Sequence, residues 1–288
     1  MKARLVFCTR FIVLCIWHLV SLMIAALVVG SFISLADPGQ PTVDLVPLLA
    51  ISFLETAVMV WVISRLKLTG IKLLVVTLII FHGVKVFLMM IELAFFLNIW
   101  ASPAMITLER VFGLELHGLF MALLFCPMAI LVMRKWKANE QNPAAIFPSP
   151  NRSLVIRILG VSALYSACYW LAGSYLLIPI AGESFIFTYS HLQVPGWMPL
   201  FQAGRGLLWA LIVLLLVRHL VLQGARLYLA VGVILAMLGS AQLLAPNPYM
   251  LDHLRYAHMF EIAVSMMVFG FLASWILRSQ QLFLKKAR

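Results

Sequence analysis

Charged side chains are scarce in this chain: Asp, Glu, Lys and Arg make up 11% of its 288 residues, and only ten are acidic. A soluble globular domain carries about a quarter charged residues and is about half apolar, whereas 64% of these residues are hydrophobic. The apolar residues form runs of about 20 or more, the length that crosses roughly 30 Å of hydrocarbon as a helix. The composition therefore predicts an all-α, polytopic membrane helix bundle.

Cysteine and the common catalytic motifs are also scarce or missing. The four cysteines form no CxxC pair, and most lie inside apolar runs: Cys8, Cys15, Cys126 and Cys168. A cysteine in such a run is typically a small buried hydrophobe, so the pattern gives no redox or metal signal. The sequence contains no HExxH, GxSxG, P-loop or GxGxxG motif, so no known signature assigns a chemistry to it. We expect no cofactor and no metal.

Proline, glycine and polar breakers divide the chain into eight apolar segments. The predicted spans are 11–35, 43–65, 71–98, 107–134, 152–180, 197–221, 223–245 and 252–278. The first is too long for a signal peptide and reads as a retained anchor. A polar linker, 139–151, separates a first unit, 1–138, from a second, 152–288.

The placement of the cations predicts the orientation of the spans. In an eight-span chain, 17 of the 21 Lys and Arg residues fall on one face of the membrane. The four exceptions are Lys85, Arg110, Arg205 and Arg255. Because basic loops stay in the cytoplasm, we expect both termini there, in a cell inner membrane. The same placement explains the net charge of +11 without nucleic acid as a partner.

A short motif, Pro-x-Met-x4-Arg, precedes both the fourth and the eighth span. It runs from Pro103 to Arg110 and again from Pro248 to Arg255. Each unit has four spans, an even number, so two copies would have the same orientation. The sequence thus predicts a tandem parallel repeat related by a pseudo-twofold axis along the membrane normal.

Three further motifs carry a family resemblance: Ile91-Glu92 in the third span, Arg205-x-x-x-Trp209 in the sixth and His258-x-x-Glu261 in the eighth. With these motifs the chain resembles a group of uncharacterised bacterial multi-span membrane proteins. Leu93 departs from the small hydroxyl residue of that group. The resemblance implies a bacterial inner-membrane protein and brings no activity with it.

Ionisable residues within the apolar spans are the candidate functional residues. A charge at mid-bilayer costs about 2.5–3.5 kcal/mol or more, so such groups usually face the protein interior and a partner. Lys85 and Glu92 are seven residues apart on one helix, too far to touch, so each needs a partner on another helix. The candidate ligand-binding residues are Glu55, His82, Lys85, Glu92, His117, Arg205, His258 and Glu261.

A less specific interpretation applies to each of these groups. Glu55 and Glu92 would then be packing ion pairs with Lys85 or Arg205, and the histidines would be neutral hydrogen-bonded interior residues. Arg110 and Arg255 would reach the outer interface as helix-end anchors. His258 and Glu261 could join Glu115 and His117 at a metal, but nothing in the sequence shows that they converge.

The depths of three groups predict one polar cavity. Glu92, Arg205 and Glu261 fall at similar depths in the outer half, so we expect both acids to line a periplasm-facing cavity with Arg205. Three functions remain open. The first is binding or transport of a small charged solute, and the second is an intramembrane enzyme acting on a lipid or lipid-linked substrate. The third is a structural or assembly subunit. The expected partners are the bilayer and a small solute or lipid.

Overall fold

The computed structural model describes residues 2–34, 44–97, 107–137, 146–147, 151–190, 193–246 and 250–286, with side chains described only between residues 5 and 278. Within those ranges the chain is helical and forms no strand. Eight helical segments are long and apolar enough to cross a membrane. The predicted fold class, an eight-span membrane helix bundle, is confirmed.

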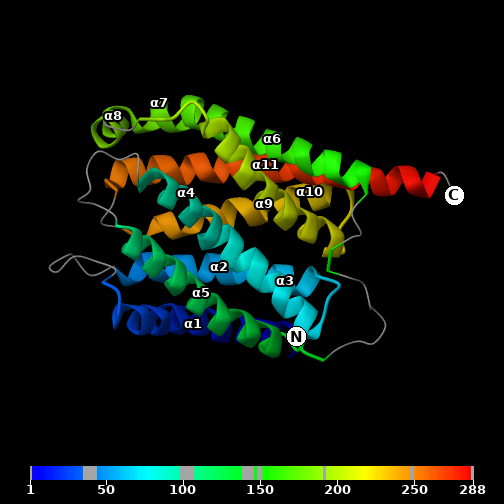
Figure 1. Ribbon diagram of the computed structural model, residues 1–288. Coiled ribbons are helices and arrows are strands. Elements are labelled where there is room, and N and C mark those ends of the chain that lie inside the picture. Colours follow the sequence, from blue (N-terminus) through cyan, green and yellow to red (C-terminus); the bar gives the residue numbers. More distant parts are fainter. Residues whose placement is uncertain are drawn as a thin grey trace.

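The spans run back and forth between the two ends of the bundle (Figure 1). The first unit contains α1 (Lys2–Gly30), α2 (Leu45–Arg65), α3 (Gly70–His82), the π-helical turn η1 (Gly83–Phe87), α4 (Leu88–Leu97) and α5 (Leu108–Val132). The second contains α6 (Arg152–Ala172), the π-helical turn η2 (Gly173–Leu177), α7 (Ile178–Ala181), α8 (Glu183–Tyr189), α9 (Met198–His219), α10 (Gly224–Ser240), the 3-10 turn η3 (Ala241–Leu244) and α11 (Asp252–Lys286). We call α1–α5 the first half and α6–α11 the second half.

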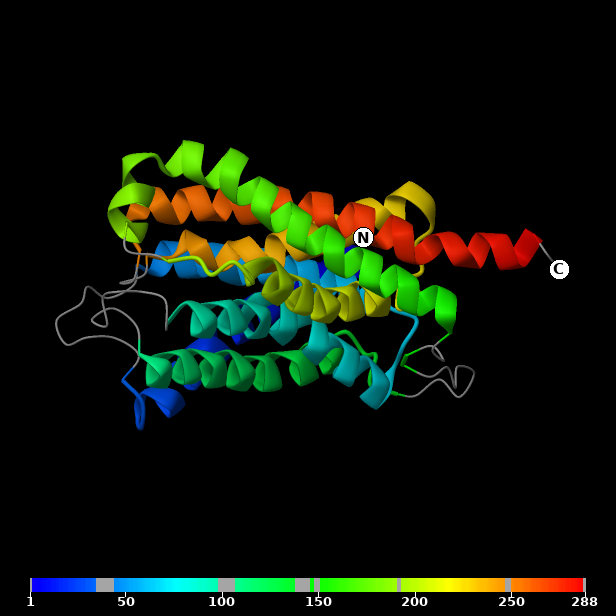
Figure 2. The ribbon, with the colours of Figure 1, turned by 45° about the horizontal axis from the view of Figure 1, so that its top comes forward.

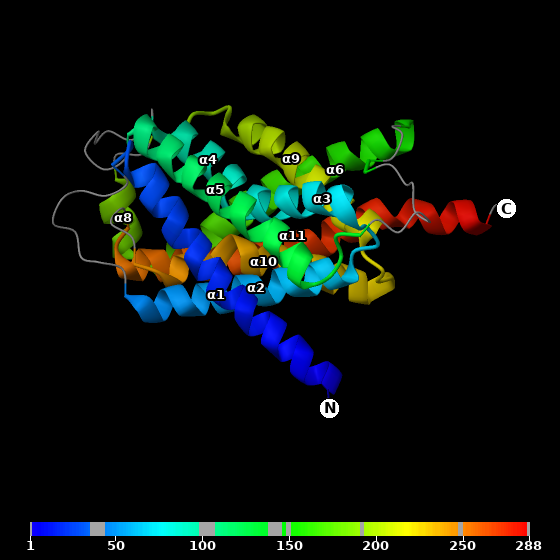
Figure 3. The ribbon, with the colours of Figure 1, turned by 90° about the horizontal axis from the view of Figure 1, so that it is seen from below.

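The predicted boundaries hold to within a few residues except at the two ends of the chain. The first span was predicted at 11–35, but α1 begins at Lys2 and ends at Gly30. Its basic residues continue the helix, and its N-terminal end projects away from the other helices (Figure 3). At the other terminus α11 continues past the rest of the bundle (Figure 2). The short helix α8 was not predicted.

Each half packs its spans in the same pattern. In the first half, α1 packs on α2 and α5, and α5 packs on α3 and α4. In the second half, α6 packs on α9 and α11, and α11 packs on α10. The second, third, sixth and seventh spans are the most buried, whereas the first, fourth, fifth and eighth lie at the periphery.

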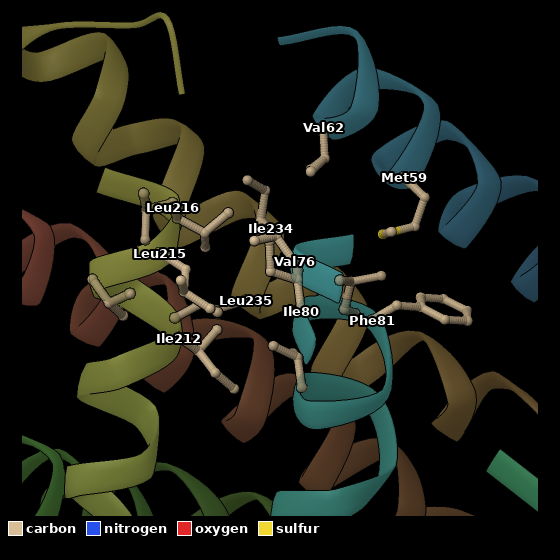
Figure 4. Close-up of a cluster of buried hydrophobic side chains, with 14 of the residues drawn as sticks. Met59, Val62, Val76, Ile80, Phe81, Ile212, Leu215, Leu216, Ile234 and Leu235 are labelled. Carbon is tan, nitrogen blue, oxygen red and sulfur yellow. The ribbon is translucent and has the colours of Figure 1, made fainter. Parts of the chain in front are cut away.

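A hydrophobic core joins the halves through these four central spans (Figure 4). Side chains of α2 and α3 meet side chains of α9 and α10 in one buried cluster, which includes Met59, Val62, Val76, Ile80, Ile212, Leu215, Ile234 and Leu235. These residues are at most 5% exposed. Removing such surface from lipid adds little hydrophobic free energy, so close packing must hold the spans together.

The ends of α2 and α9 are bonded directly to each other. Leu66 and Leu220 form an isolated antiparallel bridge, in which Lys67 N donates to His219 O and Val221 N donates to Arg65 O. The next helices then start at Gly70 and Gly224, with positive φ of 59° and 58°. Glycine adopts this conformation without steric cost, which explains why it occurs at both positions.

Two cationic side chains approach backbone carbonyls at the ends of α2 and α9. Lys135 Nζ, just after α5, donates to Leu66 O at 2.6 Å, and Arg278 Nη1 on α11 approaches Val217 O at 3.4 Å. We call this the cation-rich end of the bundle, on the right in Figure 1, and the opposite end the α8 end. The Pro-x-Met segments at 103–105 and 248–249 and the linker 139–145 lie outside the described residues.

Candidate functional site

The candidate residues fall into three groups of side chains. The Glu55 cluster is His18, Glu55 and Lys85. The Arg205 cluster is Glu92, Tyr165, Tyr169, Gln202 and Arg205. The His258 chain is Tyr189, His258 and Glu261. The remaining two candidates, His82 and His117, make separate contacts.

The Glu55 cluster joins the first three spans at the middle of the bundle. Glu55 is fully buried on α2, and Lys85 Nζ reaches both of its carboxylate oxygens at 2.5 Å. His18 Nε2 on α1 lies 2.9 Å from Glu55 Oε2. The cluster therefore matches the packing ion pair that the sequence allowed: a buried carboxylate satisfied from two neighbouring helices.

Lys85 owes its position to a break in helical regularity. It lies in the π-helical turn Gly83–Phe87, and such a turn inserts one extra residue and re-aims the side chains that follow it. Val86 of the same turn packs so closely on α5 that a Cβ added at Gly118 would lie 2.5 Å from Val86 Cγ2. The turn thus orients Lys85 toward Glu55, and Glu92 lies further along the same span.

The Arg205 cluster connects the two halves. Arg205 on α9 is 2% exposed, and its Nη1 lies 2.8 Å from Glu92 Oε2 on α4. Nη1 also donates to Gln202 Oε1 at 2.7 Å, and Nη2 donates to Leu88 O at 2.7 Å. The sequence predicted that Arg205 would pair with Glu92, and the structure brings them together.

Two tyrosines of α6 complete this cluster. The guanidinium of Arg205 lies 5.6 Å from the centre of the Tyr165 ring, within the range of a cation–π contact. Tyr169 interacts electrostatically with Glu92. Sequence reasoning missed both tyrosines, and it missed Gln202, although Gln202 is three residues from Arg205 and shares its helix face.

The His258 chain lies at the α8 end and crosses from α8 to α11. Tyr189 Oη lies 3.0 Å from His258 Nε2, and His258 Nδ1 lies 3.8 Å from Glu261 Oε2. Burial, reinforced by the negative charges of Glu92 and Glu261, raises the pKa of the Tyr189 phenol. Tyr189 therefore stays neutral, and the direction of its hydrogen bond with His258 Nε2 depends on the imidazole tautomer.

The Arg205 cluster and the His258 chain lie toward the same end of the bundle, and together we call them the polar region. Tyr165 interacts electrostatically with Glu92, Arg205 and Glu261, and Tyr189 with Glu92 and Glu261. Counted along each helix from its end at the α8 side, Glu92, Arg205 and Glu261 lie about 8, 10 and 14 Å deep. Glu261 is paired with His258 on its own helix rather than with Arg205.

The remaining candidates make local contacts. His82 Nε2 lies 3.1 Å from Glu115 Oε1 on α5, and His117 Nε2 lies 3.2 Å from Leu22 O on α1. Neither contact joins the Arg205 cluster. These side chains fit the interpretation of interior histidines that tie neighbouring spans together.

Arg255 is not an interface anchor. It is 1% exposed, and its Nη1 donates to Leu243 O at 2.5 Å and Leu244 O at 3.0 Å. Those carbonyls end the seventh span, where a helix leaves acceptors without an intrahelical donor. Arg255 therefore caps α10 and η3 from α11, which corrects the snorkelling interpretation.

Among the described residues no group of three or more His, Cys, Asp or Glu side chains is arranged to hold a metal ion. No family model, curated protein or solved structure matches the chain. The function must therefore be argued from the geometry of the polar region itself.

Proposed function

We propose that this protein binds a small charged solute in the polar region at the α8 end, as a transporter or a membrane-embedded receptor. The observation that carries the proposal is the Arg205–Glu92 pair at 2.8 Å, because it joins the two halves. Its carboxylate remains 22% exposed, and His258 and Glu261 beside it are 19% and 12% exposed. These side chains are more accessible than Glu55, which is fully buried.

The proposal includes a duplicated architecture. The equivalent packing of the two halves, the matched starts at Gly70 and Gly224 and the bridge between Leu66 and Leu220 all support a parallel repeat. In parallel-repeat transporters the substrate lies between the repeats near the bilayer midplane. Glu92 from the first half and Arg205 from the second fit that arrangement.

We also propose that both termini are cytoplasmic and that the α8 end faces the periplasm of a bacterial inner membrane. The support is the gathering of Arg and Lys at the cation-rich end, together with the family resemblance of the Glu92, Arg205 and His258 motifs. With this orientation the polar region would open outward.

The test is ligand binding by the purified chain in lipid nanodiscs, screened by thermal unfolding against amino acids, amines, carboxylates, phosphates and neutral sugars. A ligand that binds only the folded state raises the unfolding temperature as its concentration increases. We expect at least one charged class to do so, and we expect Glu92→Gln to weaken the effect. Glu109→Gln, at an exposed position on α5, is the matched control. If no class raises the unfolding temperature, the proposal is wrong.

A second candidate function is an enzyme that acts on a lipid-linked substrate. The Tyr189–His258–Glu261 order of hydroxyl, imidazole and carboxylate favours it, since the same order activates a hydroxyl in hydrolases. Turnover of a lipid-linked substrate that His258→Gln abolishes would support this alternative. A structural subunit, the third hypothesis, is supported by Glu55, whose charge Lys85 already neutralises.

A further inference from the structure

Two side chains of the Arg205 cluster hold buried hydrogen-bond donors that have no acceptor. Gln202 is fully buried and Arg205 nearly so. Gln202 Nε2 and Arg205 Nε make no hydrogen bond within the described part of the chain. A buried N–H group without an acceptor is unfavourable and uncommon in folded proteins.

The orientation of the Gln202 amide is fixed by its neighbour. Arginine carries donors and no acceptor, so the Gln202 atom at 2.7 Å from Arg205 Nη1 must be the oxygen. The nitrogen, with its two hydrogens, then points away from the guanidinium contact. Exchanging the two amide atoms would break that hydrogen bond.

The acceptors that contact the Arg205 guanidinium are already engaged. Glu92 Oε2 lies against Arg205 Nη1. Leu88 O accepts from Arg205 Nη2. Within the described residues, no protein group accepts a hydrogen bond from Arg205 Nε or Gln202 Nε2.

We infer that Arg205 and Gln202 bind the oxyanion of a zwitterion, a small molecule or headgroup that also carries an ammonium group. Carboxylate and phosphate oxygens are the preferred acceptors for a guanidinium. Glu92 already balances the charge of Arg205, so a plain anion would leave a negative charge uncompensated among Glu92 and Glu261. An ammonium group on the same ligand removes that imbalance by facing the two carboxylates.

This inference rests on the proposed function and narrows its solute class. A free amino acid or aminophosphate provides the zwitterion from solution, and phosphatidylethanolamine provides it from the bilayer. Both carry an ammonium group close to an oxyanion. The two sources are separated by the composition of the membrane used in the experiment.

The experiment measures thermal unfolding of the full chain in phosphatidylcholine nanodiscs with glycine, phosphoethanolamine, acetate or methylamine added. We expect a saturable rise in unfolding temperature with a zwitterionic probe that exceeds the rise with acetate or methylamine at equal concentration. In a parallel arm, phosphatidylethanolamine replaces part of the phosphatidylcholine and no solute is added. A rise in that arm assigns the oxyanion to the lipid.

Gln202→Leu is the decisive variant, because it removes the free donors and keeps the volume and charge of the site. It should fold with an unliganded unfolding temperature close to that of the wild type, because it removes the unpaired amide donor while Glu92 still pairs with Arg205 Nη1. The rise in unfolding temperature with a zwitterionic probe should be lost in this variant. Gln223→Leu, at an exposed glutamine, should keep it.

Three outcomes would overturn the inference. The rise could persist in Gln202→Leu, or none of the probes or lipids could produce one. Methylamine alone could raise the unfolding temperature as much as the zwitterions do. That result would support solute binding and contradict the assignment of an oxyanion to Arg205 and Gln202.

Discussion

At the scale of single residues, the strongest constraint on the spans comes from buried ion pairs, because a buried charge without its partner is costly. Glu55 and Lys85 neutralise each other in the Glu55 cluster, where Glu55 is fully buried and the Lys85 side chain is 8% exposed. Removing one partner of a buried pair leaves an uncompensated charge, whereas replacing both by neutral groups is often tolerated. The two kinds of substitution therefore have different expected costs.

We predict that Glu55→Gln and Lys85→Met each lower the free energy of unfolding by about 3–5 kcal/mol. The double variant Glu55→Gln/Lys85→Met should recover most of that loss. Unfolding in bicelles measures the three values, with Glu109→Gln as the exposed control. Losses that simply add in the double variant would show that the pair does not form.

The pairings themselves could be predicted only in part. The cost of an isolated charge in lipid required that Lys85 and Glu92 have partners on other helices, and Glu55 and Arg205 were among the candidates. Glu115 as the partner of His82 and Tyr189 as a partner of His258 were not predicted, because these contacts depend on how α5, α8 and α11 rotate about their axes. Arg255 was misassigned because a position in the first turn of a helix does not distinguish an anchor from an internal cap.

At the scale of helices, glycines set how closely the spans approach. A Cβ at Gly232 on α10 would lie 2.6 Å from Met267 O on α11, and a Cβ at Gly270 on α11 would lie 2.8 Å from Gly232 Cα. A Cβ at Gly160 on α6 meets nothing within 4 Å. Small residues at such crossings let the backbones touch, which is the main source of helix association in lipid.

We predict opposite effects for two chemically identical substitutions. Gly232→Ala should lower the free energy of unfolding by about 1–3 kcal/mol, because the overpacked helices must separate. Gly160→Ala should raise it by up to about 1 kcal/mol through helix propensity. Unfolding in bicelles compares them, and a stabilised Gly232→Ala would contradict the close crossing of α10 and α11.

Helix lengths were predictable, while helix irregularities were not. Runs of apolar residues bounded by glycine and proline locate the eight spans well, because the thickness of the membrane fixes their length. The π-helical turns at Gly83–Phe87 and Gly173–Leu177 leave no hydropathy signal. Since the first of these turns orients Lys85, the geometry of the Glu55 cluster could not be predicted from the hydrophobic periodicity.

At the scale of the whole molecule, the distribution of cations predicts a single orientation. Lys137 lies at the cation-rich end, and Glu183 lies on α8 at the opposite end; both are exposed. In a background without the four native cysteines, Lys137→Cys should resist an impermeant thiol reagent in intact cells and Glu183→Cys should react. Strong labelling at position 137 would contradict the proposed topology.

The sequence predicted two four-span units, but it did not predict which spans lie at the interface between them. Hydropathy alone cannot tell which apolar face meets protein and which meets lipid, so the central position of α2, α3, α9 and α10 came from the structure. The depths of Glu92, Arg205 and Glu261 predicted one cavity; the structure pairs Glu92 with Arg205 and Glu261 with His258. The tyrosines of the polar region and Gln202 were not predicted, because uncharged side chains carry no comparable cost in lipid.

The central claim is that a charge pair between the halves, Glu92 with Arg205, organises the polar region. A double-mutant cycle of Glu92→Gln and Arg205→Met, measured by unfolding in bicelles, tests it most directly. We predict a coupling free energy of about 1–3 kcal/mol, the range for residues in one ion-pair network. The control cycle of Glu109→Gln with Arg205→Met should be additive to within about 0.5 kcal/mol. Additivity at Glu92 and Arg205 as well would contradict the account.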